Sequence, residues 1–237
     1  MPQTLIFDKD GTLIGFQETW GPYTRDALTD LATPQAPASV LAETIGFDMQ
    51  TGRYAPESPA IAGTTADVAA LLATRDPRSA AEIEALLNAR PVRAQPVAPL
   101  APLLDELIAA GHRLAVMTND AEAPARRQLA EMGVLARFEM VVGYDSGHGA
   151  KPHPAPLLAI AEALGTSPGD CTMIGDSTHD LDAARAAGMM GVGVLSGPAT
   201  AADLAAADAI LPDITHLPDW LASRIGSTPQ AARPTPR

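Results

Sequence analysis

The chain has 237 residues, of which 46% are hydrophobic and 4% aromatic, and its formal net charge is −12. This length suffices for one large domain or a domain plus a smaller one, and the acidic balance argues against nucleic acid and anionic membranes as partners. A single cysteine, Cys171, excludes an intramolecular disulfide; because we find neither a leader pattern nor an apolar run of about 20 residues, we expect a soluble cytoplasmic protein.

The first predicted strand, residues 4–7, ends in two carboxylates, Asp8 and Asp10. Side chains two apart in an extended chain point the same way, so both carboxylates face one site. They repel each other at neutral pH unless a cation lies nearby or one of them holds a proton. Such a pair can supply a nucleophile and a proton shuttle. Gly11 frees the backbone to turn tightly and to bring its N–H near an anion.

Two simpler interpretations of this stretch are an acidic turn and part of a calcium-binding loop. A calcium loop needs a glutamate at the twelfth position counted from Asp8. Thr19 stands at that position and Glu18 comes one place early. The calcium interpretation is therefore disfavoured.

Residues 15–96 show no strong strand pattern, and we predict a small, all-helical cap domain there. The helix candidates are 26–31, 39–45, 65–73 and a helix that starts after Ser79. Thr65 is a good N-cap, and Ser79 with Glu82 fits a capping box. Residues 52–63 are predicted to form a proline-containing loop.

From residue 97 onward, predicted strands and helices alternate. The strands are 113–117, 138–142, 171–174, 191–195 and 209–211, and the helices are 102–110, 123–132, 155–164, one that ends at Gly188, and 200–207. The alternation predicts an α/β fold, a doubly wound parallel sheet with helices on both faces. We assign 1–14 and 97–225 to this domain and 15–96 to the cap. Residues 226–237 are rich in Pro, Ser and Thr, and we expect a flexible tail.

Four of the predicted strands end in polar residues. These are Asp8 and Asp10, then Thr118 and Asn119, then the glycine-rich loop to Lys151, and finally Asp176 and Asp180. In a parallel α/β sheet, ligands bind at the carboxyl ends of the strands. The four ends would together supply a nucleophile, a hydroxyl, a cation and a metal-binding carboxylate.

The order and content of these ends resemble the four motifs of the haloacid dehalogenase-like (HAD) hydrolase superfamily, most of whose members are phosphatases. The resemblance starts at Asp8-x-Asp10-Gly11-Thr12-Leu13 and implies a HAD-like Rossmannoid core. It implies Asp8 as the nucleophile that forms a phosphoaspartate, and Asp10 as the general acid and then base. Mg²⁺ would be held by Asp8, the backbone carbonyl of Asp10, and Asp176. Dehalogenases of the superfamily lack the second aspartate, which disfavours dehalogenation.

The remaining motif residues would bind the phosphoryl group. The Thr118 hydroxyl and the N–H groups of Asn119 and Gly11 would donate to its oxygens, and Lys151 would offset charge on Asp8 and on the phosphoryl group. Asp180 would orient Lys151 or metal-bound water.

Each of these residues also has a structural interpretation that the sequence leaves open. Asp176 and Thr118 are typical helix N-caps, and Asp180 suits the first turn of a helix. Lys151 resembles a surface charge, although the proline after it stiffens the loop.

The cap resembles that of the phosphoglycolate phosphatase-like group. Residues 14–20, however, depart from the Val-Asp-Ser that commonly follows the first motif there. A carboxylated substrate would require an arginine from the cap, and the candidates are Arg53, Arg75 and Arg78. Trp20 and Tyr23 either line the pocket or pack under the cap. No role is assigned to His148, His153 or His179.

These observations predict a Mg²⁺-dependent phosphomonoesterase that acts on a small phosphorylated metabolite, with phosphoglycolate as the nearest named compound. We expect a monomer or homodimer. The alternatives are a phosphotransferase or phosphomutase that uses the same phosphoaspartate, and a non-catalytic binding protein on the same fold. Five charged or polar residues clustered at one edge speak against the last alternative.

Overall fold

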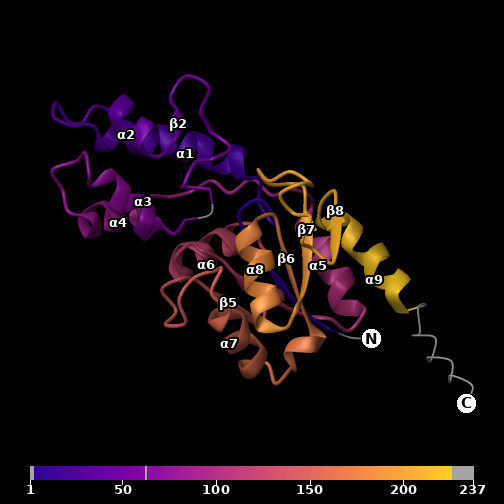
Figure 1. Ribbon diagram of the computed structural model, residues 1–237. Coiled ribbons are helices and arrows are strands. Elements are labelled where there is room, and N and C mark those ends of the chain that lie inside the picture. Colours follow the sequence, from indigo (N-terminus) through magenta and orange to yellow (C-terminus); the bar gives the residue numbers. More distant parts are fainter. Residues whose placement is uncertain (1–2, 62, 226–237) are drawn as a thin grey trace, which may run out of the picture.

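The computed structural model describes residues 3–61 and 63–225, and in this part of the chain the main sheet has six parallel strands in the order β5-β4-β1-β6-β7-β8. The strands are β1 (Thr4–Phe7), β4 (Arg113–Met117), β5 (Met140–Val142), β6 (Cys171–Gly175), β7 (Met190–Val194) and β8 (Ala209–Leu211). The first motif strand, β1, lies between β4 and β6, so the motif strands are neighbours. Figure 1 shows β5 on one side of the sheet and β8 on the other.

Helices cover both faces of this sheet, which confirms the predicted doubly wound fold. They are α5 (Leu100–Ala109), α6 (Glu122–Glu131), α7 (Ala155–Ala163), α8 (Thr178–Ala187) and α9 (Leu217–Ile225). Strand β1 shows the reason: Leu5 and Phe7 pack in one hydrophobic cluster with α5, α6 and α9, whereas Ile6 packs in another with α7 and α8. Alternate side chains of a strand point to opposite faces, so a strand covered on both sides is apolar throughout.

The inserted segment, residues 15–96, has a hydrophobic cluster of its own. Its helices are α1 (Phe16–Leu31), α2 (Ala38–Thr44), α3 (Thr65–Leu72) and α4 (Ala80–Ala89). The buried members of the cluster all come from residues 27–87. Capping boxes begin α3, at Thr64 and Asp67, and α4, at Ser79 and Glu82; the N-cap of α3 is thus Thr64, one residue before the predicted one.

The prediction of an all-helical cap needs one correction. Strands β2 (Phe47–Asp48) and β3 (Arg53–Tyr54) form a short antiparallel pair within it. A two-residue strand carries too few residues for an alternating pattern, so the sequence offers no signal.

Two further predicted elements were wrong. The helix expected at 26–31 is the end of the much longer α1, whose internal Pro22 hides the helical pattern. Residues 200–207 form turns instead of a helix, although Thr200 and Asp203 do make the hydrogen bonds of a capping box. Leu204 is the one fully buried side chain of that segment, so it has almost no apolar face with which to hold a helix.

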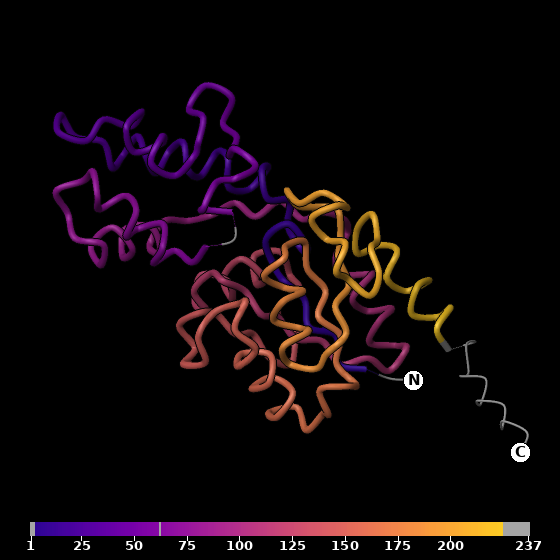
Figure 2. Tube along the Cα trace, viewed as in Figure 1, coloured from indigo at the N-terminus to yellow at the C-terminus, as the bar shows by residue number. Residues whose placement is uncertain are grey.

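The chain leaves the sheet and returns to it at one place. The Gly15 N–H donates to the Gln95 carbonyl at 2.8 Å, and the Val97 N–H donates to the Leu13 carbonyl at 3.1 Å. The trace shows these two connections side by side between two lobes (Figure 2). We therefore propose 1–14 and 97–225 as an α/β lobe and 15–96 as the cap; the predicted tail, 226–237, lies outside the described residues.

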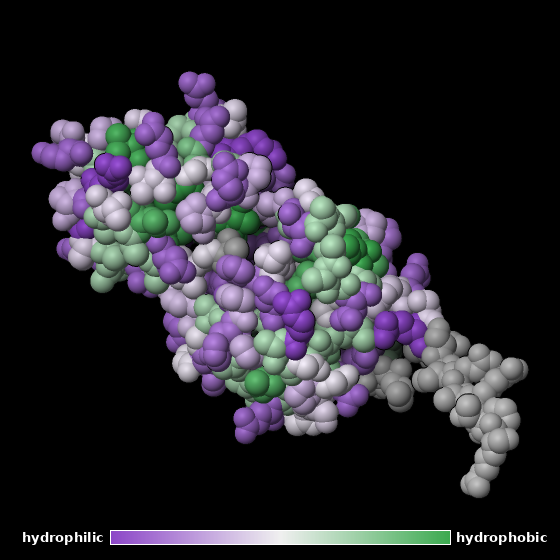
Figure 3. All heavy atoms as spheres, viewed as in Figure 1, coloured by the Kyte–Doolittle hydropathy of each residue, from purple (hydrophilic) through white to green (hydrophobic). Residues whose placement is uncertain are grey.

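Hydrophilic side chains are spread over the visible face of both lobes (Figure 3). Among the described residues, none of the helices has the length and apolar character needed to cross a bilayer.

Candidate active site

The strand ends that the sequence singled out meet at one edge of the sheet. Asp8 follows β1, Thr118 follows β4 and Asp176 follows β6, and these three strands are hydrogen-bonded neighbours. Lys151 reaches the same place from the loop after β5. All four side chains are buried.

Lys151 forms the centre of this site. Its ammonium donates to Asp8 Oδ1 and to Asp180 Oδ1, both at 2.6 Å, and to the Met117 carbonyl at 3.0 Å. The side chain is only 3% exposed. The interpretation of Lys151 as a solvated surface charge is therefore wrong.

Burial sets the electrostatics of the cluster. It raises the pKa of Asp8 to about 7; the charge of Lys151 opposes this shift, and Asp180 and Asp10 add to it. Burial, together with the charges of Asp8 and Asp180, holds the pKa of Asp176 well above its usual value. Burial alone would lower the pKa of Lys151, but Asp180 and Asp8 raise it above the ordinary lysine value. One ammonium thus faces more negative charge than it neutralises.

The carboxylates fit a divalent cation. Oxygen atoms of Asp8, Asp176 and Asp180 lie within 4.8 Å of one another. Both oxygens of Asp180 already have partners, since Oδ1 accepts from Lys151 and Oδ2 accepts from the N–H and hydroxyl of Ser177. From other side chains of the described residues, Asp176 accepts one long hydrogen bond, donated by the Thr12 hydroxyl at 3.4 Å. Asp8 and Asp176 are therefore the carboxylates with oxygens left for a hard cation.

Glycine backbones press closely against Asp176. A Cβ on Gly11 would lie 2.3 Å from Asp176 Oδ2, and one on Gly197 would lie 1.7 Å from the same oxygen. Any side chain at either position would displace the carboxylate. Gly11 also has a φ of +88°, which L-residues rarely adopt.

One predicted donor has a different partner. The Gly11 N–H, expected to face a phosphoryl oxygen, donates to the Ile14 carbonyl at 2.7 Å, because the chain turns back at once after Asp10. The Thr118 oxygen accepts from the Asp120 N–H at 3.0 Å, which leaves its proton able to point into the site. The Asn119 side chain forms a reciprocal pair with the Lys151 backbone, at 2.9 Å in both directions, and so fixes the Lys151 loop to the end of β4.

A second buried lysine lies beside Asp10. The Lys9 ammonium is 2.8 Å and 2.7 Å from the two Asp10 oxygens, 2.7 Å from Gln128 Oε1 and 3.3 Å from Asp120 Oδ2. Trp20 Nε1 of helix α1 also donates to Asp10, at 2.5 Å. No role was assigned to Lys9, Asp120 or Gln128 from the sequence.

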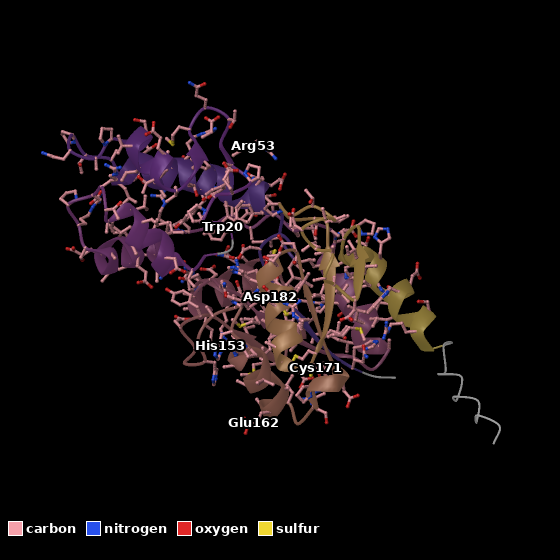
Figure 4. The ribbon with its side chains drawn as sticks, in the orientation of Figure 1. Trp20, Arg53, His153, Glu162, Cys171 and Asp182 are labelled. Atoms are coloured by element: carbon pink, nitrogen blue, oxygen red, sulfur yellow. The ribbon has the colours of Figure 1, made fainter. Side chains whose placement is uncertain are left out.

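A cavity of about 120 Å³ joins these residues to the cap. Trp20 and Tyr23 both line it, and Trp20 lies where the cap meets the α/β lobe (Figure 4). None of the predicted cap arginines is among its described lining residues; instead Arg90, at the end of α4, lines it. Arg53 borders separate grooves, and Arg78 pairs with Asp76.

The three histidines without an assigned role lie in different environments. His179 lines the cavity, and its Nδ1 is buried without a hydrogen-bond partner among the described residues. His148 and His153 are exposed loop residues, and His153 lies on the outside of the α/β lobe (Figure 4).

A parallel sheet with a buried lysine and a cluster of buried carboxylates at one edge is typical of an α/β enzyme with an acidic active site. The comparisons agree: a model of the haloacid dehalogenase-like hydrolase family matches residues 2–188. The chain belongs to this haloacid dehalogenase-like hydrolase family.

The similar proteins include phosphatases and a phosphomutase by name. A phosphoglycolate phosphatase from Xylella fastidiosa (strain 9a5c) is 33% identical over 196 residues, which cover 83% of this chain and 81% of that protein. Solved structures share the fold: a predicted phosphoglycolate phosphatase from Haemophilus somnus 129PT has a TM-score of 0.66 at 24% identity, over 93% of this chain and 98% of that one. A β-phosphoglucomutase from Clostridium difficile also has a TM-score of 0.66, at 16% identity, over 96% of this chain and 100% of the other.

Proposed function

We propose that this protein is a Mg²⁺-dependent phosphomonoesterase that works through a phosphoaspartate on Asp8 and acts on a small phosphorylated acid such as phosphoglycolate. The observation that carries the proposal is the buried Lys151, which lies 2.6 Å from Asp8 in a cluster that also contains Asp176 and Asp180. One cation among three carboxylates leaves negative charge that a divalent ion would balance. The family match and the relatives named phosphoglycolate phosphatase support the same reaction.

Each residue of the site has a proposed task. Asp8 attacks phosphorus, and Asp10 gives a proton to the leaving oxygen and then takes one from the attacking water. Lys151 and the Thr118 hydroxyl bind the phosphoryl oxygens. Asp8, the Asp10 carbonyl and Asp176 would hold Mg²⁺, which supplies positive charge to offset the repulsion between the carboxylate nucleophile and the phosphate dianion.

The cap half of the cavity favours a substrate with a short acidic leaving group. The hydroxyl groups of this half already have hydrogen-bond partners: Tyr23 donates to the Leu87 carbonyl at 2.8 Å, and Thr24 and Tyr54 form a hydrogen bond of 2.5 Å with each other. A sugar with many hydroxyls would therefore find few free partners, and each unpaired buried polar group carries an energetic cost. This favours a phosphatase over a sugar phosphomutase, the alternative that the β-phosphoglucomutase neighbour raises.

Arg90 is the proposed carboxylate ligand. Its Nη1 pairs with Asp30 on the outer side, and its guanidinium lies 6.0 Å from the centre of the Tyr23 ring. Its Nε is buried without a hydrogen-bond partner among the described residues. A guanidinium binds carboxylates through pairs of neighbouring N–H groups, so the edge that carries Nε can receive the carboxylate of the substrate.

The test is phosphate release by the purified full chain from 2-phosphoglycolate, glucose 1-phosphate and p-nitrophenyl phosphate, with Mg²⁺ and with EDTA. We expect 2-phosphoglycolate to be the best substrate by kcat/KM, and EDTA to abolish turnover. Asp8→Asn should remove activity by a factor of about 1,000 or more while the melting temperature stays near that of the wild type. Turnover retained in this variant would exclude Asp8 as the nucleophile, and conversion of glucose 1-phosphate to glucose 6-phosphate would establish the mutase alternative.

A further inference from the structure

The buried Lys9 takes no part in the reaction proposed above, yet it is among the most enclosed polar groups of the protein. Its side chain has no exposed surface. Burial by itself would lower the pKa of the Lys9 ammonium, but Asp10 and Asp120 raise it above the usual value, so the charge is retained. Enclosing a charge in this way costs several kcal/mol before its partners compensate.

The composition of the chain makes the choice of residue informative. Of its 16 basic residues only Lys9 and Lys151 are lysines, and both are buried beside the aspartates of the first motif. The surface cations are all arginines. A chain that uses arginine elsewhere keeps the compact, single-point ammonium at the two positions that contact Asp8 and Asp10.

The contacts of Lys9 indicate that it restrains the Asp10 carboxylate. The ammonium reaches both Asp10 oxygens, while Gln128 of α6, at 2.7 Å, and Asp120, at 3.3 Å, hold it from behind. Asp120 is itself fixed, since its Oδ1 accepts from the Ala121 N–H at 2.8 Å. Asp10 lines the cavity and is 17% exposed, so its carboxylate would otherwise be free to rotate away from the reacting group.

We propose that Lys9 is a positioning residue: anchored by Gln128 and Asp120, its ammonium holds the Asp10 carboxylate toward the leaving oxygen of the substrate. Trp20 completes the arrangement from the cap by donating to Asp10 Oδ1. The inference rests on the role of Asp10 in the proposed function. If Lys9 were only one partner of a structural ion pair, a different result would be expected. A buried ion pair adds little net stability beyond what well-packed apolar side chains in its place would provide.

The experiment compares two aryl phosphates that differ mainly in the leaving group. p-Nitrophenolate leaves without a proton, whereas phenolate from phenyl phosphate benefits from one. We expect Lys9→Met to lower kcat for phenyl phosphate about 100-fold, in line with the usual contribution of a general acid, and kcat for p-nitrophenyl phosphate much less. KM should change little for either substrate.

Two further variants separate positioning from stability. Lys9→Met with Asp120→Asn removes the buried carboxylate that Lys9→Met leaves unpaired, so it should recover the melting temperature but keep the defect on phenyl phosphate. Leu129→Ala is the control for general destabilisation, because Leu129 is fully buried on the same helix as Gln128 and is not a partner of Asp10. It should lower the melting temperature and leave the ratio of the two kcat values unchanged.

The results distinguish the possible failures. If the wild type releases phosphate neither from the aryl phosphates nor from 2-phosphoglycolate, the proposed function fails. If Lys9→Met loses equal activity on both substrates, or if the double variant recovers full activity on phenyl phosphate, Lys9 is a structural counter-ion and the inference is overturned.

Discussion

The two halves of the cavity are built in opposite ways. The half that belongs to the α/β lobe consists of buried charges at strand ends, and Lys151 alone ties together Asp8, Asp180 and the end of β4. The cap half is formed mainly by apolar and aromatic side chains, with Arg90 as its cation. The sheet thus fixes groups suited to phosphoryl transfer, whereas the cap offers a small apolar chamber suited to selecting the leaving group. Changes in the first half should abolish turnover, and changes in the second should redirect it.

The sharpest test of the charged half is Lys151→Met. It removes the partner of Asp8 and Asp180 and leaves buried carboxylates unpaired, which typically costs 3–5 kcal/mol. We expect kcat to fall about 1,000-fold, at the upper end for loss of a group that stabilises transition-state charge, and the melting temperature to drop. Steady-state kinetics and thermal melting measure both. The control is Arg185→Met, which removes an exposed pair with Asp182 and should change neither.

A smaller effect is expected where backbone holds the charged half in place. In Gly197→Ala the new Cβ would lie 1.7 Å from Asp176 Oδ2, so the carboxylate must move. We expect the apparent affinity for Mg²⁺ to fall 10- to 100-fold, as for loss of groups that orient metal ligands. A Mg²⁺ titration of phosphate release measures this. Gly169→Ala, where a Cβ meets nothing within 4 Å, is the matched control, and equal losses in both variants would contradict the role given to Asp176.

Substitutions in the cap half should change KM. Arg90→Gln removes the guanidinium, and the loss of a hydrogen bond to a charged group is worth about 1.5–3 kcal/mol, so KM for 2-phosphoglycolate should rise at least about 10-fold. Turnover of p-nitrophenyl phosphate, which has no carboxylate, should stay the same. Arg53→Gln, outside the cavity, provides the comparison. A rise of equal size for both substrates would remove Arg90 as a carboxylate ligand.

The last prediction concerns the stability of the protein without metal, where the effect of a single pH unit is small. The pKa of Asp8 is raised to about 7 by burial in the folded protein, while an unfolded aspartate has a pKa of about 3.9. Between these values the folded state binds more protons, so the free energy of unfolding should decrease as pH rises from about 4 to 7, by roughly 1 kcal/mol per pH unit. Urea midpoints in EDTA measure this slope. It should be shallower in Asp8→Asn and in the presence of Mg²⁺; an identical slope in the variant would assign it to other groups.

The predicted and observed structures agree where the predictive pattern lies within a single helix or strand. The apolar run of β1 followed by Asp8 and Asp10 predicts both a buried strand and converging carboxylates, and Ser79 with Glu82 predicts the start of α4. They differ where a signal is short or interrupted. β2 and β3 have two residues each, and Pro22 lies inside α1.

The amino-acid sequence by itself determined the parallel α/β fold, the family and the residues at the ends of the strands, because alternation of apolar runs with polar ends is a local property of the chain. Only the tertiary structure decided the partners of these residues. Lys9 meets Gln128 from 119 positions away, Arg90 replaces the expected arginines at the cavity, and Gly197 presses on Asp176. Such contacts depend on how separate elements pack, and no pattern within one element specifies them.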